Sequence, residues 1–368
     1  MDALSRQNLK KLFAALETDK PSVFTDLDKT SCIEGRKDYA EGNAAETGVP
    51  ACYMQPDLRR AFTEIKENGG EAYIVTGRHW ADRRENDVTG EKLPDGAFHD
   101  LLGGAKAFES FNAVAGHGRL LVKNGKTTVL RRDANEENTL KEQKFERYAG
   151  ERVLGIKKEM FERWPEMRGL IRAEYKKHLS YIDIAGFIEQ SPEEGKKALA
   201  FIDTQMKYIM DGKNPDGTKN PDAPENPDNA MIYAVEPTGA MEIRSKNQSK
   251  RNGVEKSGFL EEAYAKGGPV LVMGDSLGKN GTDRDMVEAV RSFFKSKNAA
   301  DRVYVFHVMN GDKNRITDKT DSCFPDIAVK NPDELGQIMK MVAGRTKSRA
   351  NASVLTKAAL NRKQAERR

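Results

Sequence analysis

Two carboxylates stand close together near the start of the chain, directly after a short apolar run. Asp26 follows Ser22–Thr25, and Asp28 comes two residues later in the segment Asp26-Leu27-Asp28-Lys29-Thr30. Carboxylates this close repel each other unless a cation lies between them. Their spacing suits a nucleophile and a general acid–base that act around Mg²⁺, because this ion prefers hard oxygen ligands. A strand end followed by an ordinary polar turn gives the same pattern.

Two further polar motifs are typical of phosphate binding. Thr76-Gly77-Arg78 follows an apolar run and offers a hydroxyl and backbone amides to a phosphate oxygen, although Thr-Gly is also an ordinary turn. Lys250 precedes a helical pattern, and an ammonium at the entry of a helix can neutralise a phosphate. Lys246 is the main competitor for this role, and a solvated lysine is the plainer interpretation of either residue.

A second acidic motif follows later in the chain. Asp275 follows the apolar run Val270–Met273 after Gly274, which is the place for a metal ligand. Asp283 or Asp285 would cap the next helix and complete or support the metal site, although capping alone explains one of them. Each motif is modest alone, but four of them in this order point to phosphate chemistry.

Strands that alternate with helices must position these residues. Apolar runs bounded by Gly, Asp or Pro predict buried parallel strands at Ser22–Thr25, Ala72–Thr76, Val270–Met273, Val303–Val308 and Ile327–Val329. Helical patterns lie between several of them, so we expect an α/β fold with a Rossmann-like parallel sheet. Open sheets of this kind bind ligands at the carboxyl ends of their strands, where all four motifs lie.

The middle of the chain has a different pattern. Two helices are expected at Asn138–Tyr148 and Arg152–Arg163, followed by a strand and another helix. Residues 214–229 repeat Asn-Pro-Asp three times and are expected to form a mobile surface loop. We therefore predict an inserted α+β domain. The predicted organisation is a discontinuous core of residues 1–132 and 240–345, an inserted cap domain of residues 133–239, and a basic tail of residues 346–368.

Composition excludes several classes of protein. The 368 residues are 38% hydrophobic and 32% charged, and no stretch approaches the roughly 20 apolar residues of a membrane span. The three cysteines have no metal-type spacing and fit a reducing, cytoplasmic location. The net charge is +4, but residues 345–368 hold eight Lys or Arg and one Glu and so carry +7, which leaves the rest of the chain at 4 − 7 = −3. This tail lacks the interleaved aromatic residues of a nucleic-acid surface, so no nucleic-acid partner is expected.

The four motifs resemble those of the haloacid dehalogenase superfamily of phosphatases, over about residues 20–345. Within it, the sequence looks most like the trehalose-6-phosphate phosphatase branch, in which a cap is inserted between the second and third motifs. Gly116-His117-Gly118 resembles the His-Gly element of that branch, and Glu174–Ser180 resembles a strand of its cap. The resemblance implies a magnesium-dependent phosphatase that hydrolyses a small phosphate monoester such as trehalose 6-phosphate.

The resemblance also implies a role for each residue. Asp26 would form an aspartyl-phosphate, Asp28 would be the general acid–base, and Thr76 and Lys250 would hold the phosphoryl oxygens. The implied metal ligands are Asp26, Asp28, Asp275 and Asp283, and the implied substrate-binding residues are Thr30, Gly77, Arg78, His117, Glu174 and Lys176. A phosphomutase that uses the same intermediate, and a non-enzymatic binding protein on this scaffold, are the alternatives.

The sequence departs from the family at several places. Lys29 stands where the family usually has glycine, and about five extra residues separate Asp275 from Asp283. The cap strand also differs after Ser180, which leaves the sugar open because the cap selects the substrate. His307 lies in a predicted buried strand and is not assigned a role.

Overall fold

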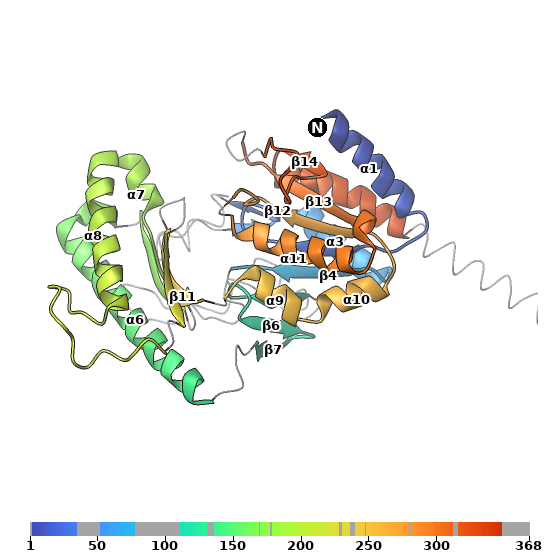
Figure 1. Cartoon of the computed structure of the whole chain (residues 1–368). Coiled ribbons are helices and arrows are strands. Elements are labelled where there is room, and N and C mark those ends of the chain that lie inside the picture. The colour runs from blue at the N-terminus through green and yellow to red at the C-terminus, as the bar shows by residue number, and fades with distance from the viewer. Residues whose placement is uncertain are drawn as a thin grey trace, which may run out of the picture.

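The computed structural model describes residues 2–34, 52–77, 111–130, 136–168, 170–176, 179–227, 230–235, 240–246, 248–279, 281–311 and 316–347. These residues form an eight-stranded and a four-stranded sheet, each with its own helices and its own apolar core (Figure 1), and a small sheet of two short strands. Among these described residues, no helix is long and apolar enough to cross a membrane.

The larger sheet has eight strands in the order β14-β13-β12-β1-β4-β5-β6-β7. Six neighbouring strands from β14 to β5 are parallel, and β6 and β7 extend the sheet in antiparallel fashion. The strands are β1 (Ser22–Thr25), β4 (Glu71–Val75), β5 (Asn112–Ala115), β6 (Leu120–Lys123), β7 (Lys126–Val129), β12 (Val270–Gly274), β13 (Val303–Val308) and β14 (Ile327–Val329). All five strands predicted for the parallel sheet are present, within one residue at each end.

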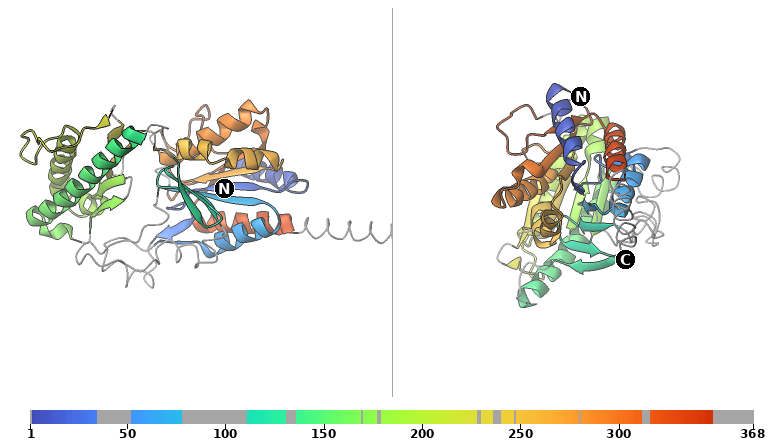
Figure 2. Two further views of the ribbon diagram at one scale, coloured as in Figure 1. Left: turned by 90° about the horizontal axis from the view of Figure 1, so that it is seen from below. Right: turned by 90° about the vertical axis from the view of Figure 1, so that its right-hand side faces the viewer.

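Helices cover both faces of this sheet, as Figure 2 shows. Successive strand residues point to opposite faces, so Val23 joins one apolar cluster and Phe24 the other. One face packs against α1 (Ala3–Ala15), α3 (Pro56–Glu67) and the helix of residues 332–347. The other packs against α9 (Lys250–Lys256), α10 (Phe259–Ala265) and α11 (Thr282–Ser296). This burial on both faces explains why the strands read as continuous apolar runs.

The smaller sheet has four antiparallel strands in the order β10-β11-β9-β8. They are β8 (Arg172–Lys176), β9 (Leu179–Asp183), β10 (Met231–Val235) and β11 (Ala240–Ser245). Helices α6 (Glu136–Arg163), α7 (Ala185–Gln190) and α8 (Pro192–Met210) share an apolar cluster with this sheet. The sheet includes β11, which begins at the first residue after the predicted 133–239 insertion.

The two helices predicted at Asn138–Tyr148 and Arg152–Arg163 are one continuous helix, α6. Gly150 lies between the two predicted helices, and a glycine inside a helix costs about 1 kcal/mol relative to alanine. The apolar stripe runs through this point, because Phe145, Val153 and Met160 all join the cluster under the small sheet. Packing of that stripe therefore outweighs the local cost.

Three short elements complete the described structure: the hairpin of β2 (Cys32–Glu34) and β3 (Cys52–Met54), and the 3₁₀ turns η1 (Pro165–Met167) and η3 (Ala300–Arg302). The described part of the Asn-Pro-Asp segment, residues 214–227, is irregular and anchored by hydrogen bonds. Gln205 donates to the carbonyl of Pro215 (3.0 Å), and the Asn226 amide both donates to and accepts from the backbone of Met231. Its predicted mobility stays a prediction.

Candidate active site

Asp26 lies where β1 ends, in the middle of the large sheet. Its backbone N–H donates to the carbonyl of Met273 (3.1 Å), so the β1 and β12 ends meet side by side. The residue is only 5% exposed. Because β1, β4 and β12 are parallel, their carboxyl ends share one edge, and this edge brings the first, second and fourth sequence motifs together.

A tight turn carries Asp28 and Thr30 after Asp26. The Thr25 and Ser31 hydroxyls share a 2.5 Å hydrogen bond across the turn, and the Thr30 hydroxyl donates to Oδ1 of Asp275 (3.0 Å). Lys29 has φ +56°, a left-handed conformation that glycine adopts with least strain. This conformation gives a physical reason for the glycine that the family resembled by the sequence usually has at this position.

Lys250 connects two of the carboxylates. Its Nζ lies 2.7 Å from Oδ1 of Asp26 and 2.5 Å from Oδ1 of Asp283, and the side chain is 3% exposed. The residue begins α9, where the Ser249 hydroxyl accepts a hydrogen bond from the N–H of Asn252. Lys246, the competing candidate, is exposed. The structure therefore brings Lys250, and not Lys246, to the carboxylates.

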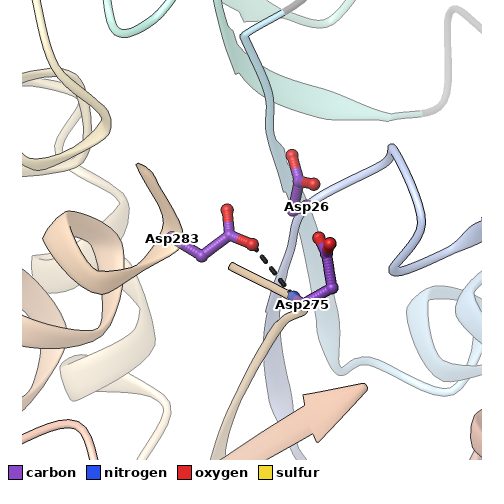
Figure 3. Close-up of side chains that lie close together, drawn as sticks. All are labelled: Asp26, Asp275 and Asp283. Carbon is purple, nitrogen blue, oxygen red and sulfur yellow. Dashed lines mark hydrogen bonds between the residues drawn. The ribbon is translucent and has the colours of Figure 1, made fainter. Parts of the chain in front are cut away.

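Asp283 holds the loop that follows β12. Its Oδ2 accepts the backbone N–H groups of Asp275 and Ser276, both at 3.0 Å, as Figure 3 shows for Asp275. Asp283 lies in the first turn of α11 and is fully buried. Both of its oxygens are thus engaged, one by the loop and one by Lys250. Asp285, the alternative, is half-buried near Glu288 and does not join this arrangement.

Three carboxylates form a potential metal site. One oxygen each of Asp26, Asp275 and Asp283 lies within 4.8 Å of the other two. With one lysine among three carboxylates, the cluster has a formal charge of −2 when all groups are ionised, which a divalent cation would neutralise. An all-oxygen donor set with few protein ligands fits Mg²⁺. The Asp28 carboxylate is not one of these three, so its predicted metal role rests on its backbone carbonyl.

The electrostatics of the cluster show how crowded the carboxylates are. Burial raises the pKa of Asp26 well above its ordinary value, Asp283 raises it further, and Lys250 acts in the opposite direction. Burial and the charge of Asp283 raise the pKa of Asp275 to about 7. Burial lowers the pKa of Lys250, but the charges of Asp26 and Asp283 outweigh it and raise the pKa overall. The site thus favours binding of a cation.

His307 supports Asp275 from β13, although no role was predicted for it. Its Nε2 lies 3.1 Å from the backbone carbonyl of Asp275, and the side chain is 1% exposed. The carbonyl can only accept, so Nε2 carries the proton and donates. Nδ1 is buried without a hydrogen-bond partner, and burial lowers the pKa of His307. The sequence signal for this role was a histidine in a predicted buried strand, next along the chain after the strand that leads to Asp275.

The second motif lies beside the turn between β5 and β6. Thr76 is fully buried, and its carbonyl accepts a hydrogen bond from the N–H of His117 (3.3 Å). A Cβ at Gly77 would lie 2.6 Å from the His117 ring, so the absence of a side chain lets this ring approach the Thr76-Gly77 backbone. The structure therefore brings Thr76, Gly77 and His117 together. Arg78 and His79 lie outside the described residues.

His117 also reaches the small sheet. Its Nε2 lies 3.9 Å from Oε1 of Glu242 in β11, and Oε2 of Glu242 lies 3.3 Å from Nε of Arg244. Neither Glu242 nor Arg244 was predicted as a site residue. The signal available in the sequence was the pair of opposite charges on either side of Ile243.

The predicted cap residues Glu174 and Lys176 lie in β8, and His178 lies outside the described residues. In register, Glu174 is opposite Tyr181, and Tyr181 is opposite Glu242 on the far side of β9. One row of the small sheet therefore leads from Glu174 to the residue that meets His117.

The sequence matches no protein-family model and no curated protein, but it is similar to solved structures. The C-terminal domain of trehalose-6-phosphate phosphatase from C. albicans superposes with a TM-score of 0.53 at 15% identity, covering 92% of this chain and 97% of that one. This chain has the haloacid dehalogenase fold. The predicted fold class is therefore confirmed, and the likeness concerns the fold alone.

Two further solved structures are similar to this haloacid dehalogenase fold. Trehalose-6-phosphate phosphatase from Aspergillus fumigatus has a TM-score of 0.47 at 12% identity, covering 91% of this chain and 97% of that one. The C-terminal domain of the trehalose synthase regulatory protein from Candida albicans has a TM-score of 0.47 at 10% identity, covering 90% and 97%.

Proposed function

We propose that this protein is a magnesium-dependent phosphatase that hydrolyses a phosphate monoester through a phosphorylated Asp26. The observation that carries the proposal is the buried ammonium of Lys250 between Asp26 and Asp283, at the carboxyl edge of the parallel sheet. A purely structural ion pair would need only one carboxylate beside Lys250. Here two carboxylates contact its ammonium, and an oxygen of a third, Asp275, lies within 4.8 Å of theirs. Such a cluster would repel a dianionic substrate unless a metal ion offsets its negative charge.

The reaction has two displacement steps at phosphorus. A carboxylate oxygen of Asp26 attacks phosphorus, an O–P bond forms, and the bond from phosphorus to the leaving alkoxide breaks. Asp28, in the carboxylic acid form, gives its proton to that alkoxide. Asp28 then takes a proton from water, whose oxygen attacks the phosphoryl group and releases inorganic phosphate and Asp26.

Lys250 and Thr76 position the transferred group. The ammonium of Lys250 already touches Asp26, so it is placed to bind a phosphoryl oxygen and to offset the negative charge that spreads over the group. Asp26, Asp275 and the carbonyl of Asp28 would hold Mg²⁺, with Asp283 fixing the loop behind them. The bound ion supplies charge neutralisation and orientation of the phosphate.

Residues on the small sheet select the alcohol in this proposal. We assign the unit from α6 to β11 as the cap, His117 and Glu242 as contacts of the substrate's organic group, and Glu174 and Lys176 of β8 as further substrate-binding residues. The hydrogen-bonding side chains suit a hydroxylated substrate such as a sugar phosphate. Trehalose 6-phosphate is the leading candidate, because the C. albicans domain with a similar fold bears the name of a phosphatase of that compound.

Phosphate release is the direct test. Purified protein is incubated with trehalose 6-phosphate, glucose 6-phosphate, a nucleoside monophosphate and a generic aryl phosphate, each with Mg²⁺ or with EDTA. We expect Mg²⁺-dependent release that Asp26→Asn lowers by on the order of 10³-fold or more. The exposed Asp301 provides the matched control, since Asp301→Asn removes a carboxylate elsewhere.

Three outcomes would contradict the proposal. Equal release by Asp26→Asn and wild type would exclude Asp26 as the nucleophile. Movement of the phosphate to another hydroxyl of the sugar, without free phosphate, would indicate a phosphomutase. Binding of the esters without turnover of any of them would indicate a binding protein.

A further inference from the structure

A small recess lies beside the β5–β6 turn. Its empty volume is ≈ 280 Å³, open solvent included. It is lined by the turn residues Gly118 and Arg119, by Leu130 after β7, by Ser245 at the end of β11, by Gln248 before α9, and by Asn252 and Lys256 of α9. The recess therefore lies where the chain returns from the small sheet to the large one.

Arg119 is a buried cation without a counter-charge in this recess. It is 6% exposed, its Nε is enclosed without a hydrogen-bond partner, and the guanidinium forms no ion pair with any residue in the described part of the chain. Lys250 shows the usual solution to the same problem, since two carboxylates contact its ammonium. Burying a charge is costly unless it is paired, so Arg119 points to a missing partner.

A second lining group is also unsatisfied. The Ser245 hydroxyl is enclosed without a hydrogen-bond partner, and Ser245 is 2% exposed. The Gln248 amide is already used, because its Nε2 donates to the carbonyl of Gly116 (2.7 Å). None of the seven lining residues is acidic, and two are cationic. A guanidinium, an ammonium and a hydroxyl that line one recess without a carboxylate have the chemistry of an oxyanion site.

We propose that this recess binds a small oxyanion such as inorganic phosphate or sulfate, with Arg119 as its principal partner. Nε of Arg119 and the Ser245 hydroxyl donate to its oxygens, and Lys256 contributes charge from the open side. The site is separate from the Asp26 cluster and does not depend on the proposed phosphatase activity.

The surroundings of the recess connect it to α9. A Cβ on Gly118 would lie 2.0 Å from the carbonyl of Ser249 and 3.0 Å from the N–H nitrogen of Gly253, so the turn beside Arg119 packs directly on the first turn of α9. Lys250 begins that helix. An anion bound by Arg119 and Ser245 therefore links the end of β11 to the turn that supports the helix of Lys250.

Thermal unfolding in anions tests the proposal. The melting temperature is measured against sodium sulfate and sodium phosphate from 0 to about 20 mM, with NaCl holding the ionic strength constant. We expect a saturable rise of a few degrees for wild-type protein, because a ligand that binds only the folded state stabilises it. Arg119→Met should raise the anion Kd at least about tenfold. Sulfate is not a product of phosphate hydrolysis, so its response is independent of catalysis.

Two more variants make the test specific. Arg251→Met removes a cation of the same helix region that is ion-paired with Glu255 and Glu288, and it should keep the wild-type anion response. Lys256→Met changes an exposed side chain and should weaken anion binding several-fold without affecting folding. In anion-free buffer, Arg119→Met should unfold no earlier than wild type, since removing an unpaired buried charge is not costly.

The proposal is overturned if Arg119→Met and Arg251→Met show the same response to sulfate. It is also overturned if Arg119→Met is markedly less stable than wild type in anion-free buffer, which would make Arg119 a structural residue. A crystal grown with sulfate should show the anion within hydrogen-bond distance of Arg119 and Ser245, and its absence there would contradict the proposal.

Discussion

The ammonium of Lys250 lies 2.7 Å from a carboxylate oxygen of Asp26, although 224 positions separate the two residues in the sequence. Both side chains are buried, and Asp283 contacts the same ammonium from a third element. A pair of this kind is costly to desolvate and is weak support for stability by itself. Its position at the carboxyl edge of the parallel sheet makes it the centre of the candidate site.

Replacing the lysines separates the two sequence candidates for phosphate binding. Lys250→Met leaves Asp26 and Asp283 buried without their cation, and breaking a buried pair of this kind costs about 3–5 kcal/mol. We expect this variant to lose both phosphate release and thermal stability, as measured by calorimetry. Lys246→Met, which alters an exposed side chain, should change the unfolding free energy by less than about 0.5 kcal/mol. A stable Lys250→Met protein with full activity would contradict this role.

Asp283 and Asp285 are expected to differ in their effect on Mg²⁺ binding. Asp283→Asn keeps an acceptor for the N–H groups of Asp275 and Ser276 but removes the charge that pairs with Lys250. Loss of such an outer partner typically weakens metal binding about 10- to 100-fold. Titration calorimetry with Mg²⁺ measures the change directly. Asp285→Asn is the control. Equal effects of the two variants on Mg²⁺ affinity would show that Asp283 has no specific role in Mg²⁺ binding.

Metal-free protein is expected to become less stable as the pH rises through the range set by Asp275. Its pKa is about 7 in the folded protein and 3.8 ordinarily, so between these values the folded state holds a proton that the unfolded state has lost. The free energy of unfolding then falls as the pH increases across this window.

The comparison with Asp275→Asn isolates this effect, because the amide does not titrate. In EDTA, the melting temperature of wild type relative to this variant should fall between about pH 5 and about pH 8. Mg²⁺ should restore wild-type stability at the upper end, since the ion offsets the carboxylate charge. A difference between the two proteins that does not change with pH would show that the pKa of Asp275 is not raised.

His307 is predicted to position the loop of Asp275. His307→Gln retains an N–H that can reach the Asp275 carbonyl, whereas His307→Leu leaves this carbonyl without its donor. We expect His307→Leu to weaken Mg²⁺ binding by about 10-fold or more and His307→Gln to retain most of it. Calorimetric Mg²⁺ affinity distinguishes this role from simple packing, because a packing defect would lower the melting temperature of both variants without this ranking.

Glu242 is predicted to affect substrate binding more than the chemical step. It lies 3.9 Å from the imidazole of His117 and comes from the small sheet, whereas the reacting groups come from the large one. Under the proposed function, Glu242→Gln should raise KM several-fold and leave kcat nearly unchanged, as steady-state phosphate release would show. A fall in kcat with constant KM would instead place Glu242 in the chemistry.

Local sequence determined the sheet and the approximate place of its reactive edge. Runs such as Val270–Met273 are apolar throughout because both faces of the large sheet are covered by helices. Asp26 follows such a run directly and Asp275 follows one after a single glycine, so their place at strand ends could be predicted from neighbouring residues alone. The continuity of α6 could not, because packing along its apolar stripe overrides the local signal of Gly150.

Tertiary structure decided everything that depends on distant residues meeting. Lys250 and Lys246 look alike in sequence, and only the packing of α9 against the β5–β6 turn brings one of them to Asp26. Glu242 and His307 likewise meet partners that come from other elements. Arg119 is buried with its Nε unpartnered among the described residues, and this too depends on the fold. Strand and helix signals act over a few residues, whereas burial and charge pairing depend on the complete fold. The sequence by itself therefore determined the fold class and the candidate nucleophile, and the tertiary structure decided which charges surround it.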